Sequence, residues 1–567
     1  MIEKLENKKN WLIGLPGGIK AIAALVFLAP FAIGLYYDWL MYAAGVIIVI
    51  MLAVVFLKRK TIVISKDPGV ILLLITGLGY FAVIPFAVDS GMAFAGGMRM
   101  LVVALFILLV MQYDGEEVRK VWQVIPASAL LMLMISLLLW VIPSTKSFVA
   151  SNAANQLGGF FQYANAFGLY QLLAIVVLMY RKDPGVFEIM AMLCLAFGIF
   201  MTGSRFIFVL MVATYLWFIF RFRSYRKILL LVGLGLGLAV ALILWITRDT
   251  VGFGRFSTLF QMPQTLYNRI IGWKDALRML KDHWYGLGYY GYQYLEPAYQ
   301  TADYYIRFVH NDWLQVMLDA GIIPGLCCVV GSLLSIKGSS PLQKLLFVLI
   351  AVAGAFDFNI AYGAILFLWV LCLNVSSKKI IPWKNGYAIL PAGIAGVFIW
   401  LGISFGLFFY GRCFEAVKIY PGNTEARIDC LSITSDLSAD EMATEILERN
   451  DCVLLAYNAK AAIASAMGDY ESMMAYKDQA LIYDPYDLFI YEEYLNMLSD
   501  AAIAANNHHD RTLFVKIAQK AISIPDVIQS VLDRTDPLAD KGMETAPDLT
   551  LPQAYLDYIE MLRDAIE

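Results

Sequence analysis

Two adjoining stretches decide how this chain must fold: RIIGWKDALRMLKDHWYGLGYYGYQYLEP (Arg269–Pro297) and YIRFVHNDWLQVMLDAGIIPG (Tyr305–Gly325). Both lie within Arg248–Gly325, the longest weakly apolar interval in a chain that otherwise consists of repeated apolar runs. The interval holds seven basic residues, a dense series of tryptophans and tyrosines, and the histidines His283 and His310. We therefore expect the functional site to be built around it.

The apolar runs on either side predict a helical membrane protein. Of the 567 residues, 60% are apolar, which exceeds what a soluble domain of this size needs. Runs of about 18–25 apolar residues have the length that crosses a bilayer as a helix. The expected spans are roughly 19–36, 39–57, 68–88, 91–111, 121–142, 164–180, 186–203, 205–221, 228–247, 311–336, 341–357, 359–376 and 386–410, about thirteen in all. The first run has no small-residue cleavage site after it, so we expect a retained helix.

Positive charge predicts the orientation of these spans. Lysines and arginines cluster before the first span and after the second, fourth, sixth, eighth, tenth and twelfth. With thirteen spans, all these clusters fall on one face, which the positive-inside rule assigns to the cytoplasm. The N-terminus is then cytoplasmic, and the long loop 248–310 and the C-terminal tail lie outside.

Charge also divides the chain into two parts. From Gly411 onward there are 28 acidic and 12 basic residues, whereas the remainder has 18 acidic and 31 basic residues. We expect a basic membrane domain over 1–410 and an acidic, soluble helical domain over 411–567. The predicted fold class is all-α: a polytopic bundle with a large extracytoplasmic loop and a helical tail.

The tail contains one segment with a repeat-like pattern. Asn458–Pro485 carries small and aromatic residues at tetratricopeptide-like positions, which are Ala461, Gly468, Tyr470, Ala480 and Pro485. Only one copy is clear, so we expect a short array of helical hairpins, with a plain helical bundle as the alternative. The tail also holds three of the seven cysteines, and a bridge such as Cys430–Cys452 is an open alternative to free thiols.

Within the loop, RIIGWKDALRMLKDH predicts an amphipathic helix. Its apolar residues Ile270, Trp273, Leu277 and Leu280 recur at helical spacing and share one face. The following GLGYYG, residues 286–291, predicts a turn whose glycines let the backbone approach a partner closely.

The loop's cations contradict the positive-inside rule, although long segments cross a membrane largely regardless of charge. Cations on the outer face indicate an anionic ligand. The alternative is that they pair on a solvated surface with the loop's own acids, which are Asp249, Asp275, Asp282, Glu296 and Asp303.

Three residues have the chemistry of a site that handles anions and protons. Arg205 follows a break between two apolar runs, where its planar donor fork suits phosphate oxygens, or where it anchors the helix by snorkelling. Arg269 opens the loop helix and is either a ligand for an anion or a surface arginine. His310 stands at the entry of the tenth span, and a neutral imidazole there can accept a proton from a hydroxyl or simply cap the helix.

Three polar residues at span ends are supporting candidates. Asn165 begins the sixth span, Asn311 begins the tenth, and both suit helix N-termini. Asp357 lies between two spans, where it is either a partner for an arginine or a turn residue. The loop aromatics form an interfacial belt, stack against sugar faces, or do both.

In order and spacing, these pieces resemble the O-antigen ligase and O-antigen polymerase superfamily of bacterial membrane glycosyltransferases. The similar segments cover about 160–360 and are GGFFQYANAFG, TGSRF, RIIGWKDALRML with DHWYGLGYYGY, VHNDWLQVMLDAGIIPG and AFDFN. One departure is Tyr285, which stands where the family usually has proline before the loop's Gly-x-Gly. A tetratricopeptide-like tail also occurs on a subset of such proteins.

The resemblance implies a multi-pass protein of the bacterial cytoplasmic membrane that takes a glycan from undecaprenyl pyrophosphate on the outer face. Arg205 and Arg269 would hold the pyrophosphate, with Arg307 as a further candidate, and His310 would act as base on the acceptor hydroxyl. The family expectation is an inverting displacement without metal or other cofactor. The acceptor would be another glycan, a lipid or a protein, and the tail would bind an acceptor or a protein partner. No nucleic acid is expected.

A transporter or flippase for lipid-linked oligosaccharides is the main competing hypothesis. Such proteins typically show internal repeats and charges near the middle of the membrane, whereas here the charges gather at one face. A membrane scaffold is a third hypothesis, but it leaves the basic loop and His310 without a role. Within the enzyme hypothesis, polymerase, ligase and protein O-oligosaccharyltransferase stay open.

Overall fold

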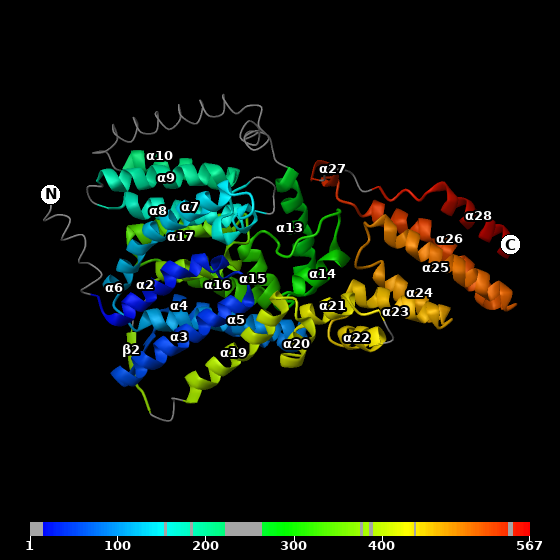
Figure 1. Cartoon of the computed structure of the whole chain (residues 1–567), viewed down its shortest axis with the longest axis horizontal. Helices are drawn as coiled ribbons and strands as arrows, with labels where there is room; N and C mark the ends of the chain where they lie inside the picture. Colours follow the sequence, from blue (N-terminus) through cyan, green and yellow to red (C-terminus); the bar gives the residue numbers. More distant parts are fainter. Residues whose placement is uncertain are drawn as a thin grey trace.

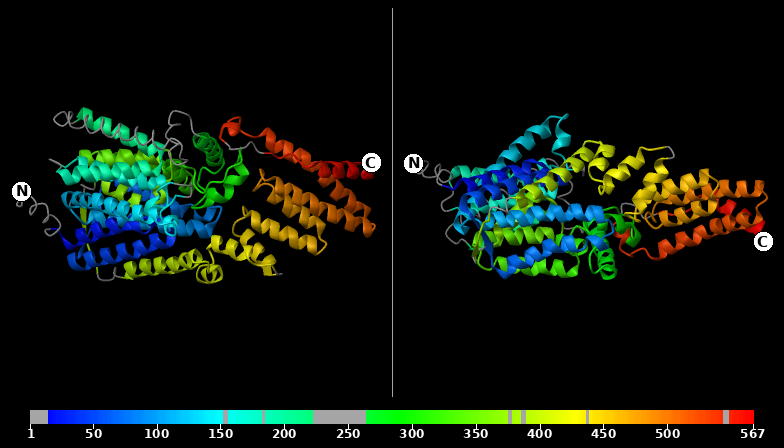
Figure 2. Two further views of the ribbon diagram at one scale, coloured as in Figure 1. Left: turned by 45° about the horizontal axis from the view of Figure 1, so that its top comes forward. Right: turned by 90° about the horizontal axis from the view of Figure 1, so that it is seen from below.

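The computed structural model describes residues 15–151, 156–181, 185–221, 264–374, 378–384, 389–435, 438–542 and 548–567. The expected span 228–247, together with Arg248 and Arg255 of the loop, lies outside these residues. Figure 1 shows an apolar helical bundle on one side and the tail helices on the other, with α13–α15 between them. Both turned views keep this elongated arrangement (Figure 2).

The first half of the bundle is built from helices joined by short 3-10 turns. Its elements are α2 (Gly17–Leu28), η1 (Ala29–Phe31), η2 (Ile33–Leu35), α3 (Asp38–Arg59), β1 (Thr61–Ser65), α4 (Pro68–Ala82), η3 (Ile84–Phe86), α5 (Ser90–Met111), α6 (Gly115–Val121), η4 (Trp122–Val124), α7 (Ile125–Val141), η5 (Lys146–Phe148), η6 (Gly159–Phe161), α8 (Ala164–Met179), α9 (Val186–Thr202) and α10 (Arg205–Arg221). Among them α8 is buried on almost every face, so it forms the centre of this half.

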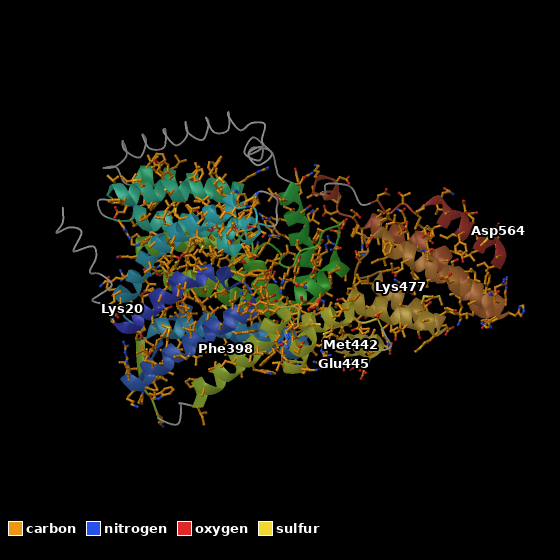
Figure 3. The ribbon with its side chains drawn as sticks, in the orientation of Figure 1. Lys20, Phe398, Met442, Glu445, Lys477 and Asp564 are labelled. Atoms are coloured by element: carbon orange, nitrogen blue, oxygen red, sulfur yellow. The ribbon has the colours of Figure 1, made fainter. Side chains whose placement is uncertain are left out.

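The second half contains the described loop helices and the return to the bundle. Its elements are α13 (Gln264–Asp282), α14 (Gly291–Tyr299), α15 (Asp312–Ala320), α16 (Ile322–Ser335), α17 (Pro341–Gly354), η8 (Asn359–Ala361), α18 (Gly363–Cys372), β2 (Lys378–Pro382) and α19 (Ile389–Phe409). β1 and β2 pair antiparallel, with Val63 opposite Ile380, a small sheet that the apolar patterning did not predict. α19 packs on α3, and a Cβ on Gly45 of α3 would lie 2.9 Å from the ring of Phe398. Phe398 is labelled on α19 in Figure 3.

The tail is helical throughout its described length. Its elements are α20 (Cys413–Ile419), α21 (Thr424–Ser432), α22 (Ser438–Leu447), α23 (Leu454–Ala466), α24 (Tyr470–Ala480), α25 (Leu488–Asn507), α26 (Arg511–Asp533), α27 (Ala539–Gly542) and α28 (Gln553–Ile566). The repeat-like segment forms the pair α23 and α24, which turns at Gly468, where φ is 78°. The wider repeat array stays a prediction. The bridge Cys430–Cys452 is absent because all seven cysteines are free.

Several described helices are apolar enough to lie in a membrane. Four also have the full length to cross it: Asp38–Arg59, Ser90–Met111, Gly115–Val141 and Ile389–Phe409. Seven further apolar helices of the described part are shorter. The protein is therefore a helical membrane protein, while the number of spans, their orientation and the division into domains stay predictions.

One expected span is wrong as a single helix. Residues 311–336 form α15 and α16, which are separated at Gly321, where φ is 98°. The carbonyl oxygen of Tyr285 would lie 2.6 Å from a Cβ at this position, so only glycine fits. The predicted GLGYYG turn docks on this break: Leu287 N–H donates to Leu318 O at 2.7 Å, and Ile322 N–H donates to Trp284 O at 3.0 Å.

Candidate active site

The carboxylate of Asp357 is the centre of a polar cluster at the end of α17. Its side chain is 3% exposed. Tyr163 Oη donates to its two oxygens at 2.8 and 2.9 Å, and the amide of Asn165 also donates to it. Two cationic or proton-carrying groups complete the cluster: His310 Nδ1 lies 3.0 Å from Oδ1, and Arg269 Nη2 lies 3.6 Å from Oδ2. Four donors around one buried carboxylate stabilise it as an anion.

His310 is held by the start of α15. Asn311 caps this helix, because its Oδ1 accepts hydrogen bonds from the N–H groups of Trp313 and Leu314, both at 3.1 Å. The turn into the cap puts His310 at a φ of 52°, a left-handed conformation that costs a non-glycine residue free energy. The strained residue is therefore the one histidine of the cluster. Its imidazole lies against Asp357.

The contact with Asp357 defines the chemistry of the imidazole. An ionised carboxylate only accepts hydrogen bonds, so the assignment that satisfies it places the proton of neutral His310 on Nδ1. Nε2 then carries the lone pair and can accept a proton from a hydroxyl group. The imidazole is 22% exposed, so a substrate can reach it while its carboxylate partner stays buried.

Arg269 reaches the cluster from α13. The predicted helix is present, but its buried face is different from the expected one: Leu277 is 56% exposed, whereas Ile271, Asp275 and Met279 are buried. The difference arises because Asp275 accepts hydrogen bonds from Thr301 and Tyr304. The face of α13 that carries Asp275 is therefore turned toward the interior.

Trp273 links α13 to the segments that carry His310 and Asp357. Its Nε1 donates to Val309 O at 3.0 Å, and its ring lies 6.0 Å from the ring of Phe356, the residue before Asp357. The same Phe356 ring lies 5.0 Å from Phe206, the residue after Arg205. The start of α10 and the middle of α13 therefore both meet the segment that carries Asp357.

Arg307 is a half-buried cation that forms no ion pair or hydrogen bond with the described residues, and its Nε is buried. The guanidinium lies over the rings of Tyr290 at 4.4 Å and Phe308 at 5.8 Å. The carboxylate of Glu425 acts on it only through space. A guanidinium in this position can take an anionic ligand.

A buried ion pair, which the sequence analysis missed, holds the ring under Arg307. Tyr290 Oη donates to Asp38 Oδ2 at 2.9 Å, and Arg99 Nη1 lies 2.8 Å from Asp38 Oδ1. Arg99 also donates to the carbonyl oxygens of Leu35 and Ala361. The signal in the sequence is Arg99 itself, a charge inside an apolar run, which marks an inward-facing and paired side chain.

The two interpretations of the loop cations each apply to different residues. Lys274 pairs with Asp536 of the tail at 2.7 Å, and Arg278 pairs with Asp275 at 3.1 Å, so these two cations stabilise the loop itself. Arg269 and Arg307 instead face the region of His310. The loop aromatics divide in the same way, because those buried in packing cannot meet a sugar: Tyr289, Tyr290, Tyr292, Tyr294 and Tyr304.

The order of the cluster along the chain now allows a comparison with known families. Residues 190–330 match the family model described as O-antigen ligase. This segment is therefore similar to the O-antigen ligase domain. No curated protein matches the chain. The matched O-antigen ligase segment begins in α9 and ends in α16, so it contains Arg205, Arg269, Arg307 and His310, while Asn165 and Asp357 lie outside it. A glycosyl-transferring membrane enzyme of glycan assembly is the function that this O-antigen ligase domain indicates.

Proposed function

We propose that the protein transfers a glycan from undecaprenyl pyrophosphate to an acceptor hydroxyl on the outer face of a bacterial cytoplasmic membrane. The observation that carries the proposal is the contact of His310 Nδ1 with the buried Asp357 carboxylate, 3.0 Å apart, with Arg269 on the same carboxylate. This arrangement presents a base, an anchor for its tautomer and a guanidinium; the base and the guanidinium lie in the segment that matches O-antigen ligase, and the anchor follows it in the chain.

In the proposed reaction, His310 Nε2 accepts the proton of the acceptor hydroxyl as its oxygen attacks the anomeric carbon of the donor sugar. A new bond forms between that oxygen and carbon, while the bond to the pyrophosphate oxygen breaks and the electron pair leaves with the phosphate. Attack from the opposite side inverts the anomeric centre. Asp357 stabilises the imidazolium that forms and holds the ring in place.

Arginines neutralise the leaving group in this proposal. The charge on pyrophosphate grows as the bond breaks, and fixed guanidinium donors favour that state over the ground state. Arg307 suits this role because it forms no ion pair with the described residues, and Arg269 suits it because the side chain stays 19% exposed beside Asp357. Arg205 at the start of α10 is the third proposed ligand. We propose that no metal is needed.

The test uses detergent-purified protein and lipid-linked oligosaccharides extracted from the source bacterium, without divalent metal. Release of lipid pyrophosphate and the length of the glycan products are followed together. His310→Ala should abolish release, whereas His283→Ala is the matched control, because the His283 ring lies within hydrogen-bond distance of Tyr285 and Tyr299 of the loop and off the Asp357 cluster. If both variants release as much as the wild type, His310 is not the base.

The choice of acceptor separates the three members of the enzyme class. Longer glycans from the lipid-linked pool alone indicate a polymerase. Release that requires an added lipid acceptor indicates a ligase, and release that requires an added polypeptide indicates a protein O-oligosaccharyltransferase. A wild-type protein that releases nothing with any acceptor, but moves these lipids across vesicle membranes, would be a flippase instead. The tail is proposed to bind the acceptor or a protein partner.

A further inference from the structure

A continuous series of aromatic rings leads away from His310. The distances between successive ring centroids are 4.9 Å for His310–Phe358, 5.3 Å for Phe358–Phe308, 6.3 Å for Phe308–Tyr36, 5.4 Å for Tyr36–Tyr37, 4.6 Å for Tyr37–Phe409 and 5.2 Å for Phe409–Tyr410. We name the six rings beyond His310 the aromatic strip. It begins at the proposed base and ends at the C-terminal end of α19.

The aromatic strip is assembled from separate parts of the chain. The start of α3, the segment before α15, the turn after α17 and the end of α19 each contribute one or two rings. Its inner rings are half-buried, and its outer rings are open to the surroundings, with Phe409 39% and Tyr410 71% exposed. Rings of the bundle core, such as Phe106 and Phe367, are instead completely buried. The strip is therefore a surface and not part of the core.

The aromatic strip differs from an interfacial belt in the direction along which its rings are arranged. Belt residues surround a bundle at the level of the lipid headgroups and face outward. Here the line of rings passes from exposed Tyr410 inward to His310 and the buried Asp357. Arg307 lies along the same line, with its guanidinium 5.8 Å from the centre of the Phe308 ring. One end of the strip is thus continuous with the proposed catalytic cluster.

We propose that the aromatic strip is the subsite for the acceptor glycan, whose sugar units stack along the rings so that the terminal hydroxyl reaches His310. The proposal rests on the proposed glycosyl transfer. Pyranose rings have an apolar face that packs on aromatic rings, and a line of several rings at separations of 4.6–6.3 Å offers successive contacts to a chain of such units. An acceptor belongs here, and not the donor pyrophosphate, because the strip leads to the proposed base.

This subsite takes the place of the buried loop tyrosines as the proposed sugar platform. Tyr289, Tyr290 and Tyr294 are all buried. Tyr290 lies under Arg307 and donates to Asp38, Tyr289 lies beside the same Asp38, and Tyr294 donates to Glu425 of the tail. Their rings support charged groups and have no free face for a glycan. The outer rings of the aromatic strip come instead from the residues just before α3 and from the C-terminal end of α19, which lie outside the segment that matches O-antigen ligase. Acceptor preference can therefore differ between enzymes that share the catalytic segment.

The experiment changes the two central rings to leucine and keeps the catalytic cluster intact. The double variant Tyr37→Leu/Phe409→Leu is compared with the wild type, using as acceptor the oligosaccharide freed by mild acid from the extracted lipid-linked pool. Loss of two ring contacts should raise the KM for this acceptor about tenfold and leave kcat within about twofold. Products of successive transfer should also become shorter. Phe187→Leu is the matched control, because Phe187 on α9 is 82% exposed and lies off the strip.

A second variant distinguishes stacking from a fault in folding. Tyr37→Trp keeps a ring on the strip and should restore the KM when combined with the native Phe409. Binding of the same oligosaccharide to His310→Ala protein, measured by saturation-transfer NMR, should weaken by the same factor when both leucines are present. An unchanged KM and unchanged binding in the leucine variant, with wild-type transfer intact, would overturn the aromatic strip as acceptor subsite. Absence of transfer by the wild type would instead contradict the proposed function itself.

Discussion

His310 Nδ1 and Asp357 Oδ1 lie 3.0 Å apart, although the two residues are 47 positions apart in the chain and belong to segments on either side of α15–α17. The left-handed backbone of His310 and the four donors around Asp357 hold this contact in place. Backbone strain at one residue and a buried anion beside it both cost free energy, so we propose that the point where they meet serves function rather than stability.

Asp357→Asn should lower the rate of glycan transfer by about 10²–10⁴-fold, with little change in KM. The amide presents a donor and an acceptor instead of two acceptor oxygens, so it no longer fixes the tautomer of His310 or stabilises the imidazolium. Initial rates of lipid pyrophosphate release measure the effect. Asp282→Asn, at the exposed end of α13, is the control. A variant with full activity would mean that Asp357 only packs the turn.

Arg307→Lys should lower kcat for release by about 10–100-fold, because lysine replaces a planar donor fork with a single point of charge. The substitution also removes the stacking of guanidinium on the Tyr290 ring. Arg278→Lys is the matched control, since Arg278 is half-exposed and pairs with Asp275 on the loop. Equal rates for the two variants would exclude Arg307 from leaving-group stabilisation.

The residues of the proposed site could be singled out in the sequence because their chemistry is unusual for their positions. A histidine and an asparagine at a span end, an acid between two spans and an arginine opening an amphipathic helix each conflict with an apolar environment. The structure brings three of them, His310, Asn165 and Arg269, onto the carboxylate of the fourth, Asp357. The spacing of residues in α13 could not show which of its cations point inward. Their direction depends on the orientation of α13, which the hydrogen bonds from Thr301 and Tyr304 to Asp275 determine.

Elements that depend on tertiary contacts were beyond the sequence. The split of 311–336 is decided by the docking of the Gly286 turn against Gly321, and neither glycine reveals its partner in the sequence. The pair Asp38–Arg99 joins α3 to α5 and requires knowledge of which helices are neighbours. The aromatic strip combines rings that lie hundreds of residues apart.

Gly321→Ala should destabilise the junction of α15 and α16. The added Cβ would lie 2.6 Å from Tyr285 O, and a φ of 98° is unfavourable for any residue with a side chain. We expect a loss of about 1–3 kcal/mol in the free energy of unfolding. A lower Tm in a thermofluor assay would report it. Gly393→Ala is the control, because a Cβ there has open space; an equal Tm for both variants would contradict the prediction.

Asp536→Asn should loosen the contact between the tail and α13. Lys274 Nζ lies 2.7 Å from Asp536 Oδ2, Asp536 N–H donates to Thr301 O, and Gly542 packs so closely on Asn268 that a Cβ would lie 2.1 Å from its Oδ1. Since Lys274 is 45% exposed, the ion pair contributes only about 0.2–1 kcal/mol. Hydrogen exchange of the α13 amides should quicken by a few-fold in the variant.

The pH dependence of the same contact has a definite sign. Burial acts to raise the pKa of Asp536, but the hydrogen bond and charge of Lys274 leave that pKa below its ordinary value. A lowered pKa in the folded state means that the stabilisation is complete above the unfolded pKa, about 3.9, and is lost as the pH falls below it. Wild type and Asp536→Asn should therefore differ at pH 7, and the difference should shrink as the pH falls below the unfolded pKa and through the lower folded pKa of Asp536. A difference that does not shrink with falling pH would show that the charge of Asp536 is not involved.

Glu296→Gln should stabilise the loop at neutral pH. Glu296 is fully buried in α14, where Oε1 accepts a hydrogen bond from Gln300 at 3.0 Å while Oε2 has no partner. Burial raises the pKa of Glu296 well above its ordinary value, and the Gln300 hydrogen bond offsets this only in part. A raised pKa of an acid in the folded state means that folding favours the protonated form, so stability falls as the pH rises through the window above about 4.3.

Glutamine removes this cost, and we expect a gain of about 1–3 kcal/mol in the free energy of unfolding at pH 7 that vanishes at pH 4. Thermal unfolding at both pH values measures it, with Glu560→Gln on exposed α28 as control; a lower Tm at pH 7 would mean that the ionised carboxylate has a role in the loop.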